Sequence, residues 1–321
     1  GERRHNERVD AVRFSGAEPP QTVSHLLGAA PAIAPFRVGH WNIGHFSLGL
    51  NGTSTIAPAD AAAKAAAYNA FFDEMAADWM GLCEYSADFT SDGSVKTRDA
   101  ILSRYAVESV GPTSGYNCNA AFATSRFEIV ETVTNYFLHH DQNRYYLAHR
   151  VAIDDAQEAW FVQTHLDFSD ETFRAEQIRD LIDDFADYPR VVIAGDFNTV
   201  LHNADGTTQM KRDDVALFTA AGYTPAETTQ RGLSARAIDN VFARGFAMED
   251  VSIHPHQSLS DHRATSCALR PLAAGEVQLP PPPPPMHYTG QARVPAIAAN
   301  PAYTVSVEGD ATAVGDYPVT V

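Results

Sequence analysis

Polar residues suited to metal and acid–base chemistry stand at the ends of apolar, strand-like runs in this chain. In the run VVIAGDFNTV, four apolar residues and a glycine lead to Asp196 and Asn198. Residues i and i+2 of an extended chain share a face, so these two side chains are expected to project together from a strand end. An Asx turn explains the fragment alone equally well. Similar positions recur at Asn42, Glu84, His165 with Asp167, Asp239 with Asn240, and Asp261 with His262.

Together these residues supply carboxylate and amide oxygens and two imidazoles, without a thiolate or a glycine-rich phosphate loop. Hard oxygen ligands of this kind suit Mg²⁺ or Mn²⁺ better than Zn²⁺. One polar strand end is commonplace, whereas a series of them within one domain indicates strands that converge on a shared rim. We therefore expect a divalent-metal site at one edge of a layered α/β domain.

The elements that must position these residues are those of a mixed α/β domain over residues 36–270. A helix is expected over 58–80, because Pro58 suits a first turn and the following aromatic residues fall on one face. An amphipathic helix is expected over 171–186 and a further helix near 211–222. Strands are expected at 36–42, 79–84, 119–125, 128–138, 145–153, 159–168, 191–198, 237–244 and 263–269.

The charge and cysteine content limit the possible partners. The chain carries a net charge of −17, and residues 37–270 hold 18 Lys and Arg against 32 Asp and Glu. This balance argues against a broad basic face that grips nucleic acid, but it is compatible with a nuclease that uses a local metal site. Cys83, Cys118 and Cys267 form no metal-binding pattern and are expected to be buried. No apolar run approaches the roughly 18 residues of a membrane span.

The two ends of the chain differ in character from the central domain. Residues 1–35 are expected to form an N-terminal arm, and residues 271–286 a proline-rich linker with six consecutive prolines. Residues 287–321 alternate like short strands but are too few to bury a core alone. This tail resembles the opening of the Ig-like repeats of bacterial surface proteins. A secreted or cell-surface location, with attachment through such repeats, is therefore expected.

The motifs WNIG, GLCEY, THLDF, GDFNT, IDNVF and SDH, in this order, resemble those of the endonuclease/exonuclease/phosphatase superfamily, which includes the pancreatic-type deoxyribonucleases. The resemblance implies an α/β fold, a four-layered sandwich of two mixed β-sheets flanked by helices, with its site at one edge. It also implies hydrolysis of phosphodiester or phosphomonoester bonds with a divalent metal, Mg²⁺ or Mn²⁺.

The same resemblance implies roles for the metal-binding residues and for the residues that activate water. Glu84 would be the principal metal ligand, with Asn42 and Asp261 close to the ion. His262, oriented by Asp239, would act as general base or polarise the attacking water.

Three further residues would act on the nucleophile and the phosphate. Asp196 and Asn198 would position the nucleophile and the phosphate oxygens. His165 would donate a hydrogen bond to the phosphoryl oxygen or assist the leaving group. The motifs leave open whether His262 or Asp196 takes the proton of the water.

Other polar residues have simpler interpretations. Asp167 either orients a site residue or caps a strand end. The remaining histidines, His40, His45 and His149 among them, are interpreted as surface or packing residues. Arg144 could reach a substrate phosphate, although an exposed strand arginine is the simpler interpretation.

The leading hypothesis is a metal-dependent phosphoesterase that cleaves phosphodiesters such as DNA or RNA. One alternative is a sphingomyelinase-like esterase, for which Phe46, Leu48 and Leu50 offer a modest apolar hairpin; another is a hydrolase of small phosphate esters. The alternative from a different class is a surface-displayed binding protein with an inactive catalytic fold. The sequence gives no indication of the oligomeric state.

Overall fold

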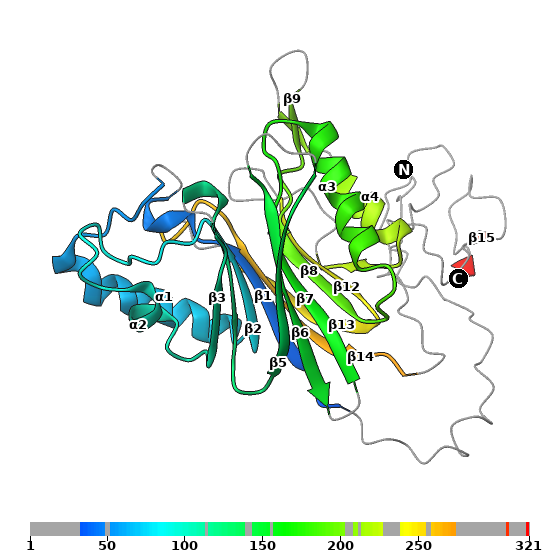
Figure 1. Cartoon of the computed structure of the whole chain (residues 1–321), viewed down its shortest axis with the longest axis horizontal. Coiled ribbons are helices and arrows are strands. Elements are labelled where there is room, and N and C mark those ends of the chain that lie inside the picture. The colour runs from blue at the N-terminus through cyan, green and yellow to red at the C-terminus, as the bar shows by residue number, and fades with distance from the viewer. Residues whose placement is uncertain are drawn as a thin grey trace, which may run out of the picture.

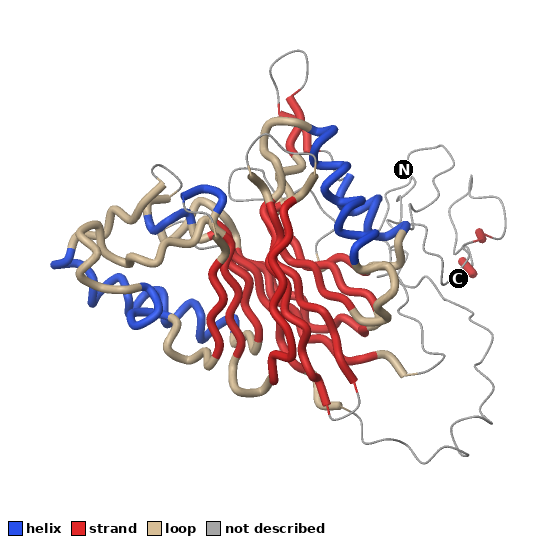
Figure 2. The backbone as a smooth tube through the Cα atoms, in the orientation of Figure 1, coloured by secondary structure: helices blue, strands red, loops and turns tan. Residues whose placement is uncertain are grey.

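Two six-stranded mixed sheets pack face to face and carry helices on both outer faces, as Figures 1 and 2 show. This arrangement confirms the expected four-layered α/β sandwich. The computed structural model describes residues 33–48, 52–112, 115–138, 143–154, 157–202, 208–210, 213–226, 238–254, 258–273, 306–307 and 319–320.

The first sheet has the order β13-β14-β1-β2-β4-β3. Its central strands β1 and β2 are parallel, so both end at the same edge. The remaining pairs are antiparallel. The strands are β1 (Phe36–Asn42), β2 (Trp79–Cys83), β3 (Val107–Val110), β4 (Asn119–Ala123), β13 (Phe246–His254) and β14 (Ala264–Pro271).

The second sheet has the order β11-β12-β8-β7-β6-β5, and its central strands β7 and β8 are again parallel. Two short ribbons pair β9 (Val200–His202) with β10 (Thr208–Met210) and β15 (Ser306–Val307) with β16 (Val319–Thr320). The strands of the second sheet are β5 (Glu128–Tyr136), β6 (Tyr145–Asp154), β7 (Gln157–His165), β8 (Val191–Asp196), β11 (Thr224–Pro225) and β12 (Asp239–Arg244).

Helices cover the outer faces. In Figure 1, α1 (Ala61–Met75) and α2 (Thr97–Ile101) lie beside the first sheet, while α3 (Glu171–Asp184) and α4 (Asp213–Ala220) lie beside the second. Short 3₁₀ turns are η1 (Gly44–Phe46), η2 (Pro58–Asp60) and η3 (Gly115–Asn117). Three buried apolar clusters fill the spaces between the four layers, and the cluster between the sheets includes Phe36, Trp79 and Phe161. Burial of this much apolar surface is the main source of stability.

The expected elements are present, with one boundary to correct. The helix expected over 58–80 ends at Met75, because Ala76 adopts a left-handed conformation with φ 48° and passes the chain into β2. Strands β3 and β13 and helix α2 were not expected from the sequence. All three cysteines are buried and free, as expected.

Glycine permits close approaches at several positions, of which Gly81 and Gly245 bear on how the sheets are joined. A Cβ atom on Gly81 in β2 would lie 1.9 Å from Oε1 of Gln163 in β7, so a larger residue there would displace the Gln163 side chain. Gly245, with φ 78°, is the single residue between β12 of the second sheet and β13 of the first. A Cβ atom at this crossing would lie 2.1 Å from the carbonyl oxygen of Pro189.

The expected terminal regions fall mostly outside the described residues. This holds for the N-terminal arm up to residue 32, for the linker beyond residue 273, and for the C-terminal module apart from β15 and β16. Among the described residues, no helix combines the length and apolar character needed to cross a membrane.

Candidate active site

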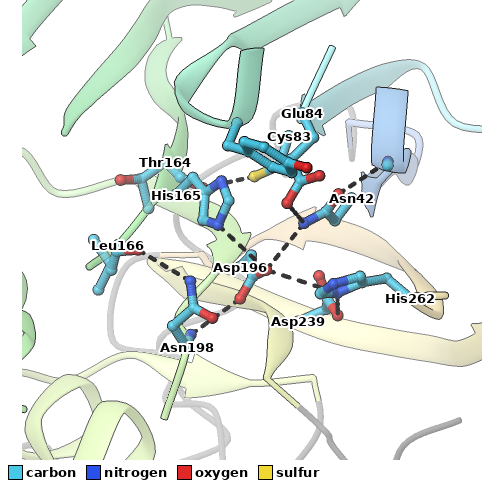
Figure 3. Close-up of polar contacts among 12 residues, drawn as sticks. Asn42, Cys83, Glu84, Thr164, His165, Leu166, Asp196, Asn198, Asp239 and His262 are labelled. Carbon is cyan, nitrogen blue, oxygen red and sulfur yellow. Dashed lines mark hydrogen bonds and ion pairs between the residues drawn. The ribbon is translucent and has the colours of Figure 1, made fainter. Parts of the chain in front are cut away.

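The polar strand ends of both sheets converge at one edge of the sandwich. Asn42 ends β1 and Glu84 directly follows β2, its parallel neighbour. In the second sheet, His165 and Asp196 end the parallel strands β7 and β8 and pair with each other in register. Asp239 begins the antiparallel strand β12 and pairs with Asp196. The topology therefore delivers the expected side chains to one place, shown in Figure 3.

Asn42 joins the two halves of the site. Its Nδ2 donates to Oε1 of Glu84 at 3.1 Å and to Oδ2 of Asp196, across the sheet interface, also at 3.1 Å. Its Oδ1 accepts from the backbone N–H of Gly44 at 3.1 Å. Asn42 is fully buried, so these bonds fix the distance between the Glu84 and Asp196 carboxylates.

His262 is held against Asp239 from the loop that precedes β14. Its Nδ1 lies 2.8 Å from Oδ2 of Asp239 and 3.6 Å from Oδ2 of Asp196. The hydroxyl of Ser260 accepts from the His262 backbone N–H at 3.0 Å and donates to the Asn42 carbonyl at 2.7 Å. This loop is therefore fastened to the end of β1, and the imidazole has a carboxylate on its Nδ1 side.

Asp196 uses its two oxygens differently. Its Oδ1 accepts from the backbone N–H of Asn198 at 3.0 Å, which is an Asx turn, while its Oδ2 faces Asn42 and lies 3.5 Å from Nε2 of His165. Asn198 has φ 48° and donates from Nδ2 to the Leu166 carbonyl at 3.0 Å. Strand β8 thus ends at Asp196, and the Asx turn keeps Asn198 beside it.

Burial and neighbouring charges set the pKa values of His262 and Asp239, and so determine which of the two carries a proton. Burial alone would lower the pKa of His262, but the charge of Asp239 and its hydrogen bond raise it to about 10. Burial would raise the pKa of Asp239, but the charge and hydrogen bond of His262 lower it to about 2. The two residues therefore form an ion pair at neutral pH.

The pKa values of the other two titrating residues of the cluster, Asp196 and His165, shift in opposite directions. Burial, and then the charge of Asp239, raise the pKa of Asp196 to about 6. Burial, followed by the positive charges of Arg144 and His262, holds the pKa of His165 well below its usual range. His165 is therefore neutral and can donate one hydrogen bond without carrying charge.

The donor atoms fit a hard divalent cation. The buried carboxylates of Glu84, Asp196 and Asp239 gather at one edge with the amide of Asn42, and such oxygen groups suit Mg²⁺ or Mn²⁺. Ligand atoms of Asp196, Asp239 and His262 lie within 4.8 Å of one another. Asp261 has an exposed side chain and follows Ser260 in the same loop. A cation here would offset the negative charge of the grouped carboxylates.

Two cationic or basic residues of the site differ from their sequence interpretation. His40, taken for a surface or packing residue, is buried with Nε2 3.0 Å from Oδ1 of Asp239 and Nδ1 3.2 Å from Oε1 of Gln163. It precedes Asn42 by two residues on β1. Because residues i and i+2 of a strand share a face, the position of Asn42 could have identified His40 as a residue near the site. Arg144 is not an exposed strand residue. It is 3% exposed, precedes β6, and feels the charges of Asp196 and Glu84.

Asp167 acts as a cap. Its Oδ1 accepts from the backbone N–H groups of Ser169 and Asp170 at 2.7 and 2.8 Å, in the loop that leads into α3. Asp170 in turn accepts from the first turn of α3. Of the two interpretations of Asp167, the strand-end cap is the one that these hydrogen bonds confirm.

Comparisons with known proteins agree with this architecture. A model of the endonuclease/exonuclease/phosphatase family matches residues 39–262. The structure of TDP2 from C. elegans has a TM-score of 0.51 at 15% identity, covering 74% of this chain and 75% of that one. TDP2 of D. rerio complexed with a single-strand DNA product has a TM-score of 0.54 at 17% identity, covering 74% and 99%.

A bacterial structure gives a similar result. A family protein from Bacteroides thetaiotaomicron has a TM-score of 0.52 at 14% identity, covering 75% of this chain and 99% of that one. At such identities these likenesses show the fold alone. No curated protein matches the chain.

The segment matched by the family model contains all the residues of the site, from Asn42 to His262. Members of this family are generally hydrolases that act on phosphoester bonds, and the gathered oxygen ligands suit the divalent metals that they use. The resemblance expected from the six motifs is confirmed, and the chain belongs to the endonuclease/exonuclease/phosphatase family.

Proposed function

We propose that this protein is a divalent-metal-dependent phosphodiesterase of nuclease-like specificity, in which a metal and His262 assist attack by water. The observation that carries the proposal is the His262–Asp239 pair, 2.8 Å apart, beside the Asn42–Glu84 pair of candidate metal ligands. A protonated imidazole held by a carboxylate next to oxygen ligands stabilises negative charge on the phosphate, and the neighbouring Asp196 carboxylate can activate the water.

Glu84, Asn42 and Asp261 would hold the cation, which we take to be Mg²⁺ or Mn²⁺. When bound, the metal would supply Lewis-acid stabilisation of charge on the phosphoryl oxygens. Asn42 donates to the carboxylates of both Glu84 and Asp196 and so fixes where each of them lies. These positions matter, because displacing a catalytic group by about 1 Å lowers the rate of the chemical step by a large factor.

The motifs offer His262 and Asp196 as acceptors of the proton of the water, but His262 already carries a proton in its ion pair with Asp239 at neutral pH. Asp239 binds Nδ1 of His262 and leaves Nε2 to face a substrate. Asp196, with a pKa of about 6, is ionised at neutral pH and has Oδ2 directed into the site. We propose that Asp196 orients the water and accepts its proton, while the protonated His262, held by Asp239, donates a hydrogen bond from Nε2 to the phosphate.

His165 and Arg144 would act on the phosphate. A neutral His165 can donate a hydrogen bond to a phosphoryl oxygen or to the leaving group without an added charge. Arg144 brings a buried positive charge to a site rich in carboxylates, as the effect of Asp196 on its pKa indicates. We propose that Asn198 positions the phosphate oxygens beside these two residues.

The substrate class is supported by two observations. The D. rerio structure with this fold is complexed with a single-strand DNA product. The apolar hairpin that a lipid esterase needs has little support, because Phe46 is buried, Leu48 alone is 41% exposed, and Leu50 lies outside the described residues. We also propose a secreted or cell-surface location, which is supported by the proline-rich linker and the repeat-like tail of the sequence.

The proposal is tested by cleavage of supercoiled plasmid and of a chromogenic phosphodiester, with Mg²⁺, with Mn²⁺ and with EDTA. We expect metal-dependent hydrolysis that Asp196→Ala and His262→Ala both abolish, while His254→Asn, on β13 away from the site, retains it. Hydrolysis of the small diester without nicking would place the substrate among small esters. Full activity of both site variants would refute the proposal, and so would the absence of hydrolysis in every metal.

A further inference from the structure

His45 is a buried imidazole that faces the candidate metal site. It lies in η1, three residues after Asn42, and is fully buried. Among the residues that the structure describes, neither of its ring nitrogens has a hydrogen-bond partner. Buried polar atoms without partners are rare in folded proteins, and each one calls for a ligand, a water or an ion.

The nearest polar atom to His45 belongs to Glu84. Nδ1 of His45 is 3.2 Å from Oε2 of Glu84, the oxygen that Asn42 does not bind, and the contact lacks the geometry of a hydrogen bond. Two neighbouring ligands of an octahedral ion, with bonds of about 2.1 Å, stand roughly 3.0 Å apart. The separation of these two atoms is therefore that of two ligands of one cation.

The backbone turns both side chains into this position. Glu84 has φ 50° and His45 has φ 53°, a left-handed conformation that non-glycine residues seldom adopt. The N–H of His45 donates to the carbonyl of Glu84 at 3.0 Å, so the pairing of β1 with β2 continues past the strand ends and holds the two residues together. Strained conformations of this kind gather at functional sites, where the surrounding structure enforces them.

We propose that Nδ1 of His45 and Oε2 of Glu84 bind the same divalent cation, an inference that rests on the proposed metal-dependent function. An imidazole in a set of oxygens changes the metal preference. Mg²⁺ favours oxygen alone, whereas first-row transition ions accept nitrogen readily. The site is accordingly selective for Mn²⁺ over Mg²⁺, and His45 sets this selectivity.

The test is metal binding by the full chain, with and without the imidazole. His45→Asn places an amide near the position of Nδ1, keeps a polar contact with Glu84, and removes the nitrogen ligand. We expect the Kd for Mn²⁺ to rise about tenfold or more in this variant, while the Kd for Mg²⁺ changes much less. Calorimetric titration gives both constants. Electron spin-echo spectroscopy of bound Mn²⁺ should show nitrogen modulation in the wild type and its loss in the variant.

His254→Asn is the matched control, because Nδ1 of His254 lies 3.0 Å from the Glu74 carboxylate, away from the site. Unchanged Mn²⁺ binding and nitrogen modulation in His45→Asn would overturn the inference and leave the proposed function standing. A wild type that binds no divalent metal would overturn both. Should His45→Asn not fold, His45→Gln repeats the test. If neither folds, the spectrum of His262→Asn decides, since absent nitrogen modulation there overturns the inference.

Discussion

Asp239 is the residue on which the charge balance of the site depends. One of its oxygens binds His262 and the other binds His40, at 2.8 and 3.0 Å. Its carboxylate is therefore fixed from both sides, and its charge raises the pKa of His262 against the opposing effect of burial. His40 acts through Asp239 and is a positioning residue.

Asp239→Asn is expected to lower kcat/KM by about 10²- to 10⁴-fold, because it removes the charge that orients and stabilises the imidazolium. The pKa of His262, about 10 in the wild type, should fall in the variant. Steady-state kinetics and histidine NMR titration measure the two effects. A variant with full activity and an unchanged His262 pKa would contradict this role.

The sequence predicted much of the site at this scale, because a polar residue that ends an apolar strand is visible without a structure. The Asn42–Asp196 hydrogen bond could not be predicted, since it joins residues of different sheets and depends on how the sheets pack. His45 could not be predicted either, because its left-handed backbone departs from the strand periodicity that revealed its neighbours.

At the scale of elements, α1 ends on a conformation that its sequence does not favour. Ala76 has φ 48° and an exposed side chain, and glycine is the usual residue at such a position. An alanine at this position gives no sequence signal of a helix end. The sequence therefore predicts a helix that continues beyond Ala76. Strands β3 and β13 were missed for a related reason: both are only partly buried and lack a continuous apolar run.

Ala76→Gly is expected to stabilise the protein by about 1 kcal/mol, because glycine adopts the left-handed conformation without the steric cost that a Cβ atom brings. Ala66→Gly, at an exposed position within α1, is the matched control and should destabilise by about 1 kcal/mol. Urea unfolding measures both free energies. Destabilisation by Ala76→Gly equal to that of the control would show that φ at this position is not left-handed.

The interface between the sheets contains a histidine that makes stability depend on pH. His149 of β6 is buried, accepts at Nδ1 from Nε1 of Trp79 in β2 at 3.2 Å, and has its pKa lowered to about 4 by burial. The unfolded chain, with a pKa near 6.5, binds a proton before the folded one does as the pH falls. The contribution of neutral His149 to the free energy of unfolding is complete above about pH 6.5 and is lost as the pH falls from there to about 4.

The wild type should therefore lose roughly 3 kcal/mol of unfolding free energy to His149 across this interval. His149→Asn keeps an acceptor for Trp79 and does not titrate. We expect this variant to be less stable at pH 7, because it leaves a cavity, and to lose less stability than the wild type on acidification. Urea unfolding at pH 7 and pH 4.5 tests this. Equal acid losses in the two proteins would show that His149 is protonated in the folded state.

For the whole molecule, the fold class and the order of the elements were predictable, but the order of the strands was not. Strand order depends on which apolar faces meet, and many sheets share the same series of strands. The terminal regions lie largely outside the described residues, so the expected Ig-like module stays a prediction. The net charge of −17 is a property of the whole chain that the site does not reveal.

This charge predicts an unusual salt dependence. A polyanionic substrate is repelled by the acidic domain, and added salt screens that repulsion. At fixed Mg²⁺, plasmid nicking should therefore rise or stay level as NaCl increases from about 25 to about 150 mM. Proteins that grip DNA through basic faces lose affinity steeply over such a range. A steep loss of nicking would indicate a local basic surface that binds DNA despite the negative net charge of the chain.

The passage of the chain from one sheet to the other and back has a consequence for its synthesis. The strands of the second sheet lie between residues 128 and 244, and only after Gly245 does the chain return to add β13 and β14 to the first sheet. While the ribosome makes these residues, β1 has an open edge where β14 will lie. His262 emerges between these last two strands. If the proposed function holds, the nascent protein is therefore expected to lack hydrolytic activity until His262 has been made, at the stage when the first sheet closes.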